Sequence, residues 1–362
     1  MINTIELETN GISTFILNAS EYLSFKNIDV TVVAPNIVNE SIKNQLSQHH
    51  VNLVEVPYRR KNTLKYFFLL IRLISMEHYD VVHVNGNSTT MAIELLAAMM
   101  GGATLRISHI HSPSNKHPIA TKILRPLFEL TVNGRLACSS NAGNALYGKK
   151  QYKIIRNGIN IHNFDFDPTV RKEFRKNLNI KNNEILLGHV GAFNIGKNQK
   201  YLIDLLSNLN SKYKLILLGS GIGDGSYLKK VKNYVREKKL DDRVIFAGSV
   251  NNVNDYLNAI DIFVFPSLFE GQPFSLIEAL ASGLPCYISD SISRKNDLTG
   301  NVIFLPLKNR KKWISEIKKA FKNFNRINRC KSNQRELISK GYDEKENIDV
   351  LINYYRKKLN RK

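Results

Sequence analysis

Cysteine is scarce in this sequence. The 362 residues contain only three, Cys138, Cys286 and Cys330. They are odd in number and far apart along the chain, and two of them lie in apolar runs typical of strands. A disulfide framework and a cysteine-based zinc site are therefore excluded, and we expect a reduced, cytoplasmic protein.

Long hydrophobic runs are also missing. The longest apolar stretch, near residues 66–74, contains Arg72 and is too short to cross a bilayer. No pattern typical of a signal peptide is visible at the start of the sequence. A location in the cytoplasm follows, and peripheral binding to the inner face of the cell membrane stays open.

Acidic residues are few relative to basic ones. The sequence has 52 Lys and Arg against 31 Asp and Glu, a formal net charge of +21. Residues 308–362 alone hold 18 basic and 6 acidic side chains. Such a tail favours an anionic neighbour, namely lipid head groups, nucleic acid or a polyanionic substrate. A coding bias towards Lys with a solvated helical face explains it equally well. No nucleic-acid reading motif is present, so nucleic acid is not the expected partner.

The order of apolar runs indicates two α/β domains, and a chain of this length suits two cores. Short strand-like runs alternate with helical stretches, which predicts βαβ units and parallel sheets. Strands are predicted at 29–34, 51–56, 80–84, 104–110, 134–139 and 152–155, and then at 185–190, 214–218, 243–247, 261–265, 285–289 and 302–305. Helices are predicted at 13–25, 64–77, 90–100, 198–209, 226–238, 253–259, 273–282 and 344–359.

The most informative stretch runs from Asp261 to Asp290. An apolar strand leads into a polar turn with Glu270, Gly271 and Gln272, and a helix with Phe274 and Ser275 in its first turn follows. Backbone N–H groups at a helix start lack partners and carry positive partial charge, so they favour an anion such as a diphosphate. Gly271 lets the backbone approach a ligand, and Pro273 has no N–H to leave unpaired at the first turn.

Two carboxylates, Glu270 and Glu278, flank this turn. Beside phosphates a carboxylate is electrostatically unfavourable unless it accepts hydrogen bonds from sugar or ribose hydroxyls. Each alone could equally be a solvated acid. Together with the Glu-Gly-x-Pro-Phe turn and the Ala-Ser-Gly-Leu-Pro exit, they resemble the donor-site signature of retaining glycosyltransferases of family 4, with two glutamates separated by seven residues. The part around 284–305 is similar to capsular and exopolysaccharide members.

This resemblance implies the GT-B fold, an α/β architecture of two doubly wound Rossmann-like domains facing across a cleft. It places an acceptor-side domain at 1–157, a nucleotide-sugar donor domain at 158–343 and a terminal helix at 344–362 that crosses back to the first domain. The segment 157–160 resembles the interdomain hinge of the family, with Asn160 replacing an Asp. The first strand of the first domain is largely missing. Either the start site is internal to the gene, or this edge of the domain is built differently.

The loop after the strand at 185–190 carries a second candidate phosphate contact. Gly191 ends the strand and Lys197 opens the next helix, where an amine can neutralise a leaving diphosphate. The pattern resembles the Gly-Arg-x4-Lys motif of the family, although Ala192 stands where the family has Arg. Losing one charge-assisted contact could cost about 1.5–3 kcal/mol. Asn194, or an Arg from elsewhere, is a candidate to compensate.

Further positions follow from the same resemblance. The main chain of Val250 is expected to hold the nucleotide base, and Gly11 corresponds to one glycine of a Gly-Gly loop that approaches the donor. In the first domain, His109 and His111 lie on the same side of a strand end. His111 is expected to approach the reacting sugar, and Asn85 and His109 are expected on the acceptor side. Two histidines without a third ligand at useful spacing, and no Asp-x-Asp, give no metal site.

The segment 58–72 is basic and aromatic and continues into an apolar helical stretch. It could lie on an anionic bilayer, or it could be the inward face of a domain helix. The sequence supports both interpretations equally.

The combined hypothesis is a retaining glycosyltransferase. It takes a sugar from a nucleotide-diphosphate donor, expected to be UDP-linked, and needs neither cofactor nor metal. The acceptor is a hydroxyl of a lipid-linked or other cell-surface glycan precursor. The expected catalytic residues are Lys197, Glu270 and His111. Ala192 and the short first strand motivate an alternative, a non-catalytic sugar-binding partner subunit. A polynucleotide-binding protein is a third alternative.

Overall fold

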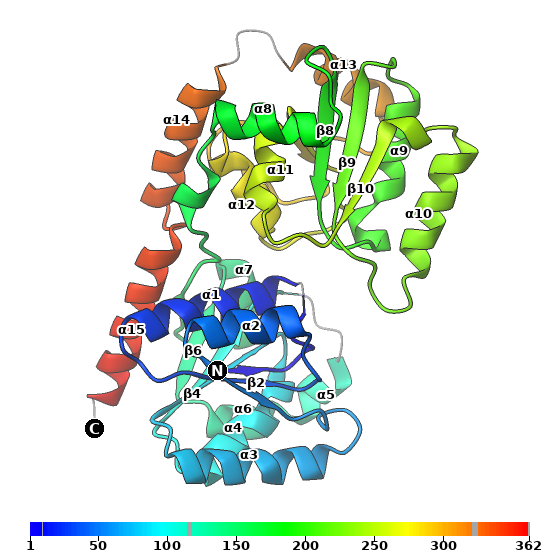
Figure 1. The fold of residues 1–362 in the computed structure, drawn as a ribbon. Coiled ribbons are helices and arrows are strands. Elements are labelled where there is room, and N and C mark those ends of the chain that lie inside the picture. Colours follow the sequence, from blue (N-terminus) through cyan, green and yellow to red (C-terminus); the bar gives the residue numbers. More distant parts are fainter. Residues whose placement is uncertain (9, 114–117, 321–324, 361–362) are drawn as a thin grey trace. The chain divides into compact units, whose positions relative to one another are not determined.

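The computed structural model describes residues 1–8, 10–113, 118–320 and 325–360. The chain divides into two compact units, each built on its own parallel sheet (Figure 1). Unit 1 comprises Met1–Gly158 and Glu344–Lys362, and unit 2 comprises Ile159–Asp343. The last helix, α15 (Glu344–Leu359), therefore belongs with the first part of the chain, and it packs against α1 (Gly11–Phe25).

Unit 1 has a seven-stranded parallel sheet in the order β3-β2-β1-β4-β5-β6-β7. The inner strands are buried, as expected for a parallel sheet covered on both faces, and β4 and β5 carry buried polar side chains among their apolar ones. The strands are β1 (Ile2–Asn3), β2 (Thr31–Ala34), β3 (Asn52–Glu55), β4 (Val81–Gly86), β5 (Leu105–Ile110), β6 (Gly134–Ala137) and β7 (Lys153–Ile154). Besides α1 and α15, its helices are α2 (Glu40–Gln48), α3 (Thr63–Glu77), α4 (Ala92–Met100), α5 (Pro118–Ile123), α6 (Arg125–Thr131) and α7 (Ser140–Tyr147).

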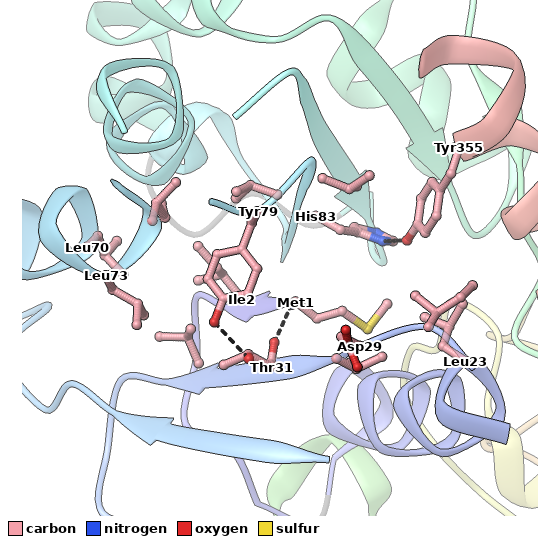
Figure 2. Close-up of a pocket in the computed structure, with 16 residues that line it drawn as sticks. Met1, Ile2, Leu23, Asp29, Thr31, Leu70, Leu73, Tyr79, His83 and Tyr355 are labelled. Atoms are coloured by element: carbon pink, nitrogen blue, oxygen red, sulfur yellow. Dashed lines mark hydrogen bonds between the residues drawn. The ribbon is translucent and has the colours of Figure 1, made fainter. Parts of the chain in front are cut away.

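Strand β1 is only two residues long, yet it lies at the centre of the sheet between β2 and β4. Beside it is a mostly apolar cavity of about 90 Å³, lined from α1, α3 and α15 as well as the two flanking strands. Figure 2 shows its polar contacts: the Met1 amine and the Tyr79 hydroxyl both bond Thr31, and His83 bonds Tyr355. The cavity lies at the amino ends of the strands, opposite the edge where doubly wound sheets bind ligands.

Unit 2 has a six-stranded parallel sheet in the order β10-β9-β8-β11-β12-β13. Two apolar clusters cover its two faces, and the lone tryptophan of the sequence, Trp313, is fully buried in one of them. The strands are β8 (Ile185–Val190), β9 (Tyr213–Leu218), β10 (Val244–Gly248), β11 (Ile262–Phe265), β12 (Cys286–Ser289) and β13 (Val302–Leu305). The helices are α8 (Pro168–Asn177), α9 (Gln199–Ser207), α10 (Ser226–Glu237), α11 (Val253–Ala259), α12 (Phe274–Ala281), α13 (Arg310–Lys319) and α14 (Arg326–Ser339).

The predicted α/β class and the twelve predicted strands are confirmed, with boundaries that differ by at most two residues. Several helices with mostly polar sequences, such as α2 and α8, were not predicted, because few apolar residues mark their inward faces. All three cysteines are free and buried. Within the described ranges, no helix has the length and apolar content to pass through a bilayer.

Candidate active site

The candidate donor site lies at the switch point of the unit 2 sheet. Strand β8 is central, with β9 on one side and β11 on the other. The connections that leave the carboxyl ends of β8 and β11 therefore run in opposite directions, and this is where doubly wound folds open a ligand crevice. The loop after β8 carries Lys197, and the loop after β11 carries Glu270 and leads into α12.

Side chains from the loop itself hold the β8 loop in place. Asn194 caps the short 3-10 helix Ile195–Lys197, because its side-chain oxygen accepts a hydrogen bond from the Lys197 N–H at 3.0 Å. Asn198 adopts a left-handed conformation with φ of 57° and donates to the Pro266 carbonyl at 3.2 Å. The Leu268 N–H donates to the Gly196 carbonyl at 2.8 Å. These last two contacts tie the β8 loop to the β11 loop.

Lys197 and Glu270 form an ion pair across the two loops. The Lys197 Nζ lies 2.6 Å from Glu270 Oε1, and the two side chains are only 20% and 15% exposed. The amine also lies over the ring of Phe265, 4.8 Å from its centroid. The cation is thus held in a partly desolvated position where it can meet an incoming anion.

Two glycines allow the strand ends to approach closely. Gly219 has φ of 137°, and a Cβ there would lie 2.2 Å from the Gly191 carbonyl oxygen. A Cβ on Gly191 would lie 3.2 Å from Lys197 Cε and 3.3 Å from His189 Nε2. The absence of a side chain at Gly191 therefore leaves room for the Lys197 side chain, which extends past it to Glu270.

His189 lies beneath this loop and was not predicted as a site residue. Its Nδ1 is 3.0 Å from the Val264 carbonyl oxygen, so that nitrogen carries the proton. Its buried Nε2 has no hydrogen-bond partner among the described residues. Burial lowers the pKa of His189 to about 3, with a further contribution from the Lys197 charge. The ring is neutral and supports Gly191. The only sequence signal for the buried position of His189 was the alternation of side chains between the two faces of strand β8.

Helix α12 begins at Phe274, and Pro273 takes the N-cap position rather than the first helical turn predicted for it. No side chain caps the helix. The N–H groups of Phe274 and Ser275 lie in the first turn and have no intrahelical acceptor. They and the positive end of the helix dipole are therefore available to an anion at the end of the β11 loop.

The other residues of the turn fit this arrangement. A Cβ on Gly271 would meet open space, so a ligand has room there. Asn296 donates to the Gly271 carbonyl at 3.3 Å, and the Gln272 amide donates to the Tyr342 hydroxyl. Gln272 is therefore engaged with the protein, and a ligand contact by its side chain stays a prediction.

Glu278 lies on α12, one turn after Phe274. It is partly buried, and no described residue donates a hydrogen bond to its carboxylate. Burial raises its pKa to about 7 from an ordinary value of 4.5. A partly buried carboxylate without donors from the protein is an unfavourable feature that a ligand with hydroxyl groups would relieve.

Val250 follows the end of β10 by two residues. Gly219, after the neighbouring strand, donates its N–H to the Gly248 carbonyl at 2.7 Å. The segment of Val250 therefore lies at the same edge of the sheet as the other donor-site loops. A base contact by its main chain stays a prediction.

The predicted acceptor-side residues lie together in unit 1. His109 and His111 have ring centroids 4.1 Å apart, and His111 Nε2 lies 2.9 Å from Asn85 Oδ1. A third histidine, His83, was not predicted as a site residue. Its Nε2 lies 3.2 Å from His109 Nδ1, and its Nδ1 lies 2.6 Å from the Tyr355 hydroxyl. Its position two residues before Asn85 on β4 was the only local signal, because its partner Tyr355 lies on α15.

All three histidines are buried, and so is Asn85. The Phe15 ring of α1 packs against His109 and His111, with centroid distances of 4.8 and 5.0 Å. Burial lowers the pKa of His111 to about 3 and those of His83 and His109 well below 6.5. The imidazoles are therefore neutral at pH 7. Asn85 and His109 have no exposed surface in this structure, so their contact with an acceptor and the role of His111 stay predictions.

Gly11 is the first residue of α1 rather than part of the preceding loop, and it is exposed. Asn194 was suggested to compensate for Ala192, and a ligand contact by its side chain stays a prediction. Asn194 uses its side chain to cap the Lys197 N–H and to donate to the Ala192 carbonyl at 3.4 Å. It supports the loop and supplies no positive charge. Among the described residues there is no group of three or more His, Cys, Asp or Glu that could hold a metal ion.

Two family models match the chain. "Glycosyltransferase Family 4" matches residues 9–163, and "Glycosyl transferases group 1" matches residues 170–337. EpsF of Bacillus subtilis (strain 168), named as a glycosyltransferase, is 30% identical over 76% of this chain and 74% of its own length. The capsular polysaccharide biosynthesis glycosyltransferase CapH of Staphylococcus aureus is 28% identical over 70% of this chain and 72% of its own. An Escherichia coli enzyme named UDP-Gal:alpha-D-GlcNAc-diphosphoundecaprenol alpha-1,3-galactosyltransferase is 28% identical over 66% of this chain and 64% of its own.

Solved structures agree on the fold. HepE of Anabaena in complex with UDP and glucose superposes with a TM-score of 0.82 at 17% identity, covering 98% of each chain. WaaG, a glycosyltransferase involved in lipopolysaccharide biosynthesis, gives 0.71 at 13% identity, covering 96% of this chain and 98% of its own. The two parallel sheets are those of the GT-B fold. The chain belongs to glycosyltransferase family 4, of the type found in capsule and exopolysaccharide biosynthesis, and it is a glycosyltransferase.

Proposed function

We propose that the protein transfers a sugar, with retention of anomeric configuration, from a UDP-linked donor to a hydroxyl of a lipid-linked glycan precursor. The observation that carries this proposal is the Lys197–Glu270 pair at the switch point, in the loops that meet before α12. Retention is taken from the resemblance to retaining members of the family. The UDP donor and the diphosphate-linked lipid acceptor are suggested by what HepE and the Escherichia coli galactosyltransferase are named as binding or using.

The leaving diphosphate is the centre of the proposed chemistry. As the bond to the sugar breaks, negative charge develops on the diphosphate, and fixed positive groups stabilise it most in a partly desolvated site. The Lys197 amine and the N–H groups of Phe274 and Ser275 are the groups this chain supplies. In this proposal no metal ion is required, because these groups take the role of the counter-charge.

The two carboxylates have different proposed roles. Glu270 holds the Lys197 amine in place before the donor binds, and then accepts hydrogen bonds from hydroxyls of the donor sugar. Glu278 accepts hydrogen bonds from the ribose, which would supply the donors its carboxylate lacks in this structure. A diphosphate can compete for the Lys197 amine because it offers several anionic oxygens in place of the one carboxylate of Glu270.

Transfer can be measured with purified protein, radiolabelled UDP-sugars and polyprenyl-diphosphate-linked acceptors, counting label in the organic phase. We expect transfer from at least one donor, equal activity with and without EDTA, and an α-linked product from an α-linked donor by NMR. Glu270→Gln should cut the rate sharply. An inverted product would refute retention, and full activity of Glu270→Gln would remove its role.

Ala192 favours a second candidate, a non-catalytic sugar-binding partner subunit. The loop that holds Ala192 offers no substitute cation from Asn194, so the diphosphate has one fewer contact than the family pattern provides. This candidate predicts UDP binding without transfer from any donor. Ala192→Arg should raise UDP affinity whether the protein is an enzyme or a non-catalytic subunit. Sugar transfer by the wild type therefore decides between the two candidates.

A further inference from the structure

A second pocket lies in unit 1, separate from every residue assigned above. It has a volume of about 280 Å³ and is lined by residues 4–6, 35–37, Pro57 and 59–61, which follow the carboxyl ends of β1, β2 and β3. This is the edge of a doubly wound sheet at which ligands bind. Its position therefore suits a substrate that unit 1 would hold.

Three consecutive cations line the pocket, and their partners differ. The Arg59 guanidinium is held by the fully buried Glu94, with Nε 2.6 Å from Oε1, so its charge is balanced. Arg60 meets only Glu6, at 3.8 Å, and both side chains are more than half exposed. Lys61 is exposed and forms no ion pair with a described residue. Lys61 is therefore available to an anion at the pocket mouth, and Arg60 is held only by a long, exposed ion pair that an anion can displace.

Apolar side chains adjoin these cations. Ile37 lines the pocket and is 66% exposed. Helix α3 starts two residues after Lys61, and its Leu64 and Phe68 are 72% and 61% exposed and lie one turn apart. The opposite side of α3 is buried in the core, so these two exposed residues form a second apolar face of the helix. Cations next to exposed aliphatic and aromatic side chains fit an amphiphile with an anionic head.

We propose that this pocket binds the diphosphate of the lipid-linked acceptor. Arg60 and Lys61 each take one phosphate, and the lipid chain lies against Ile37, Leu64 and Phe68. The class of acceptor rests on the function proposed above. A diphosphate diester has one negative charge on each phosphate, which matches the two cations Arg60 and Lys61. Glu6 opposes binding, because the diphosphate must displace it from Arg60 and is then repelled by it.

The test uses calorimetry on the full chain with farnesyl diphosphate and, separately, inorganic pyrophosphate as probes. The variants are the double replacement Arg60→Ala with Lys61→Ala, and Glu6→Gln. Lys65→Ala is the matched control, since Lys65 follows in the same segment but lies over the Tyr58 ring and does not line the pocket. UDP binding, measured in the same samples, reports that unit 2 is folded and intact.

We expect the double variant to bind farnesyl diphosphate at least about tenfold more weakly, as loss of charge-assisted hydrogen bonds predicts. Glu6→Gln should bind it more tightly, a gain that misfolding cannot produce, and Lys65→Ala should match the wild type. Wild-type affinity in the double variant would overturn the proposal. Pyrophosphate binding as tight as farnesyl diphosphate would overturn the lipid assignment. If the wild type does not bind UDP, the proposed donor site is refuted, whatever its affinity for farnesyl diphosphate.

Discussion

Replacing Glu278 with Gln should stabilise unit 2 at neutral and alkaline pH while weakening nucleotide binding. Burial raises the pKa of Glu278 to about 7 from 4.5, so the native state binds more protons than the unfolded state between these values. The wild type therefore loses stability as pH rises from 4.5 to 7. Gln does not titrate, so the variant avoids this loss. The rise of the Glu278 pKa from 4.5 to about 7 corresponds to at most roughly 3 kcal/mol.

Trp313 makes this measurable in unit 2 alone. It is the single tryptophan of the sequence, it is fully buried in unit 2, and its fluorescence will follow urea unfolding of that unit. We expect wild type and Glu278→Gln to have similar free energies of unfolding near pH 4.5 and to differ by up to about 3 kcal/mol at pH 8. Comparing the two proteins at each pH cancels the titration of every other group. A difference that does not change between pH 5 and 8 would refute the reasoning.

Binding should move in the opposite direction. If Glu278 accepts hydrogen bonds from the ribose, an amide in its place makes weaker neutral ones, and UDP affinity should fall by roughly tenfold at pH 8. A variant that is more stable but binds UDP less well would show that the Glu278 carboxylate destabilises the fold and contributes to nucleotide binding. Unchanged UDP affinity would leave the stability argument standing and remove the ribose role.

Two further predictions concern the backbone and the buried histidines. Gly219→Ala should destabilise unit 2 by more than about 2 kcal/mol, because its Cβ would lie 2.2 Å from the Gly191 oxygen. In Gly300→Ala the Cβ meets open space, and the substitution should cost about 1 kcal/mol. Equal losses in the free energy of unfolding, followed by Trp313 fluorescence, would contradict this prediction. Unit 1 should lose stability below pH 6.5, because its buried histidines are neutral in the folded state and gain a proton on unfolding. The free energy of unfolding should fall by about 1.4 kcal/mol per pH unit for each histidine. Urea midpoints, measured by circular dichroism, that stay constant from pH 7 to 5 would contradict this prediction.

The sheets could be predicted because their strands are short, apolar and regularly spaced, and parallel strands buried on both faces leave that mark in a sequence. The donor site could be predicted in part for a related reason. Glu270, Gly271 and Phe274 are neighbours in sequence as well as in space, and the β11–α12 connection brings them to a helix start. Lys197 was placed by its position after β8, and the switch point brings it to Glu270.

The rest depended on contacts between distant parts of the chain. His83 is tied to Tyr355, 272 residues later, and no local pattern indicates that partner. The burial of His109 and Asn85 follows from how closely α1 packs, which a strand-end position does not specify. The spacing of Asn194 suggested a phosphate contact but not its role in the loop, where its oxygen caps the Lys197 N–H at the start of a short helix.

The most direct test of the donor site compares UDP and uridine binding by calorimetry in wild type, Lys197→Met and Lys200→Met. Lys200 lies three residues on, is exposed and contacts the Tyr234 ring, so it is a matched control. We predict that Lys197→Met weakens UDP binding by about tenfold or more, leaves uridine binding unchanged, and that Lys200→Met behaves as the wild type. UDP affinity in Lys197→Met equal to that of the wild type would contradict a diphosphate site at this loop.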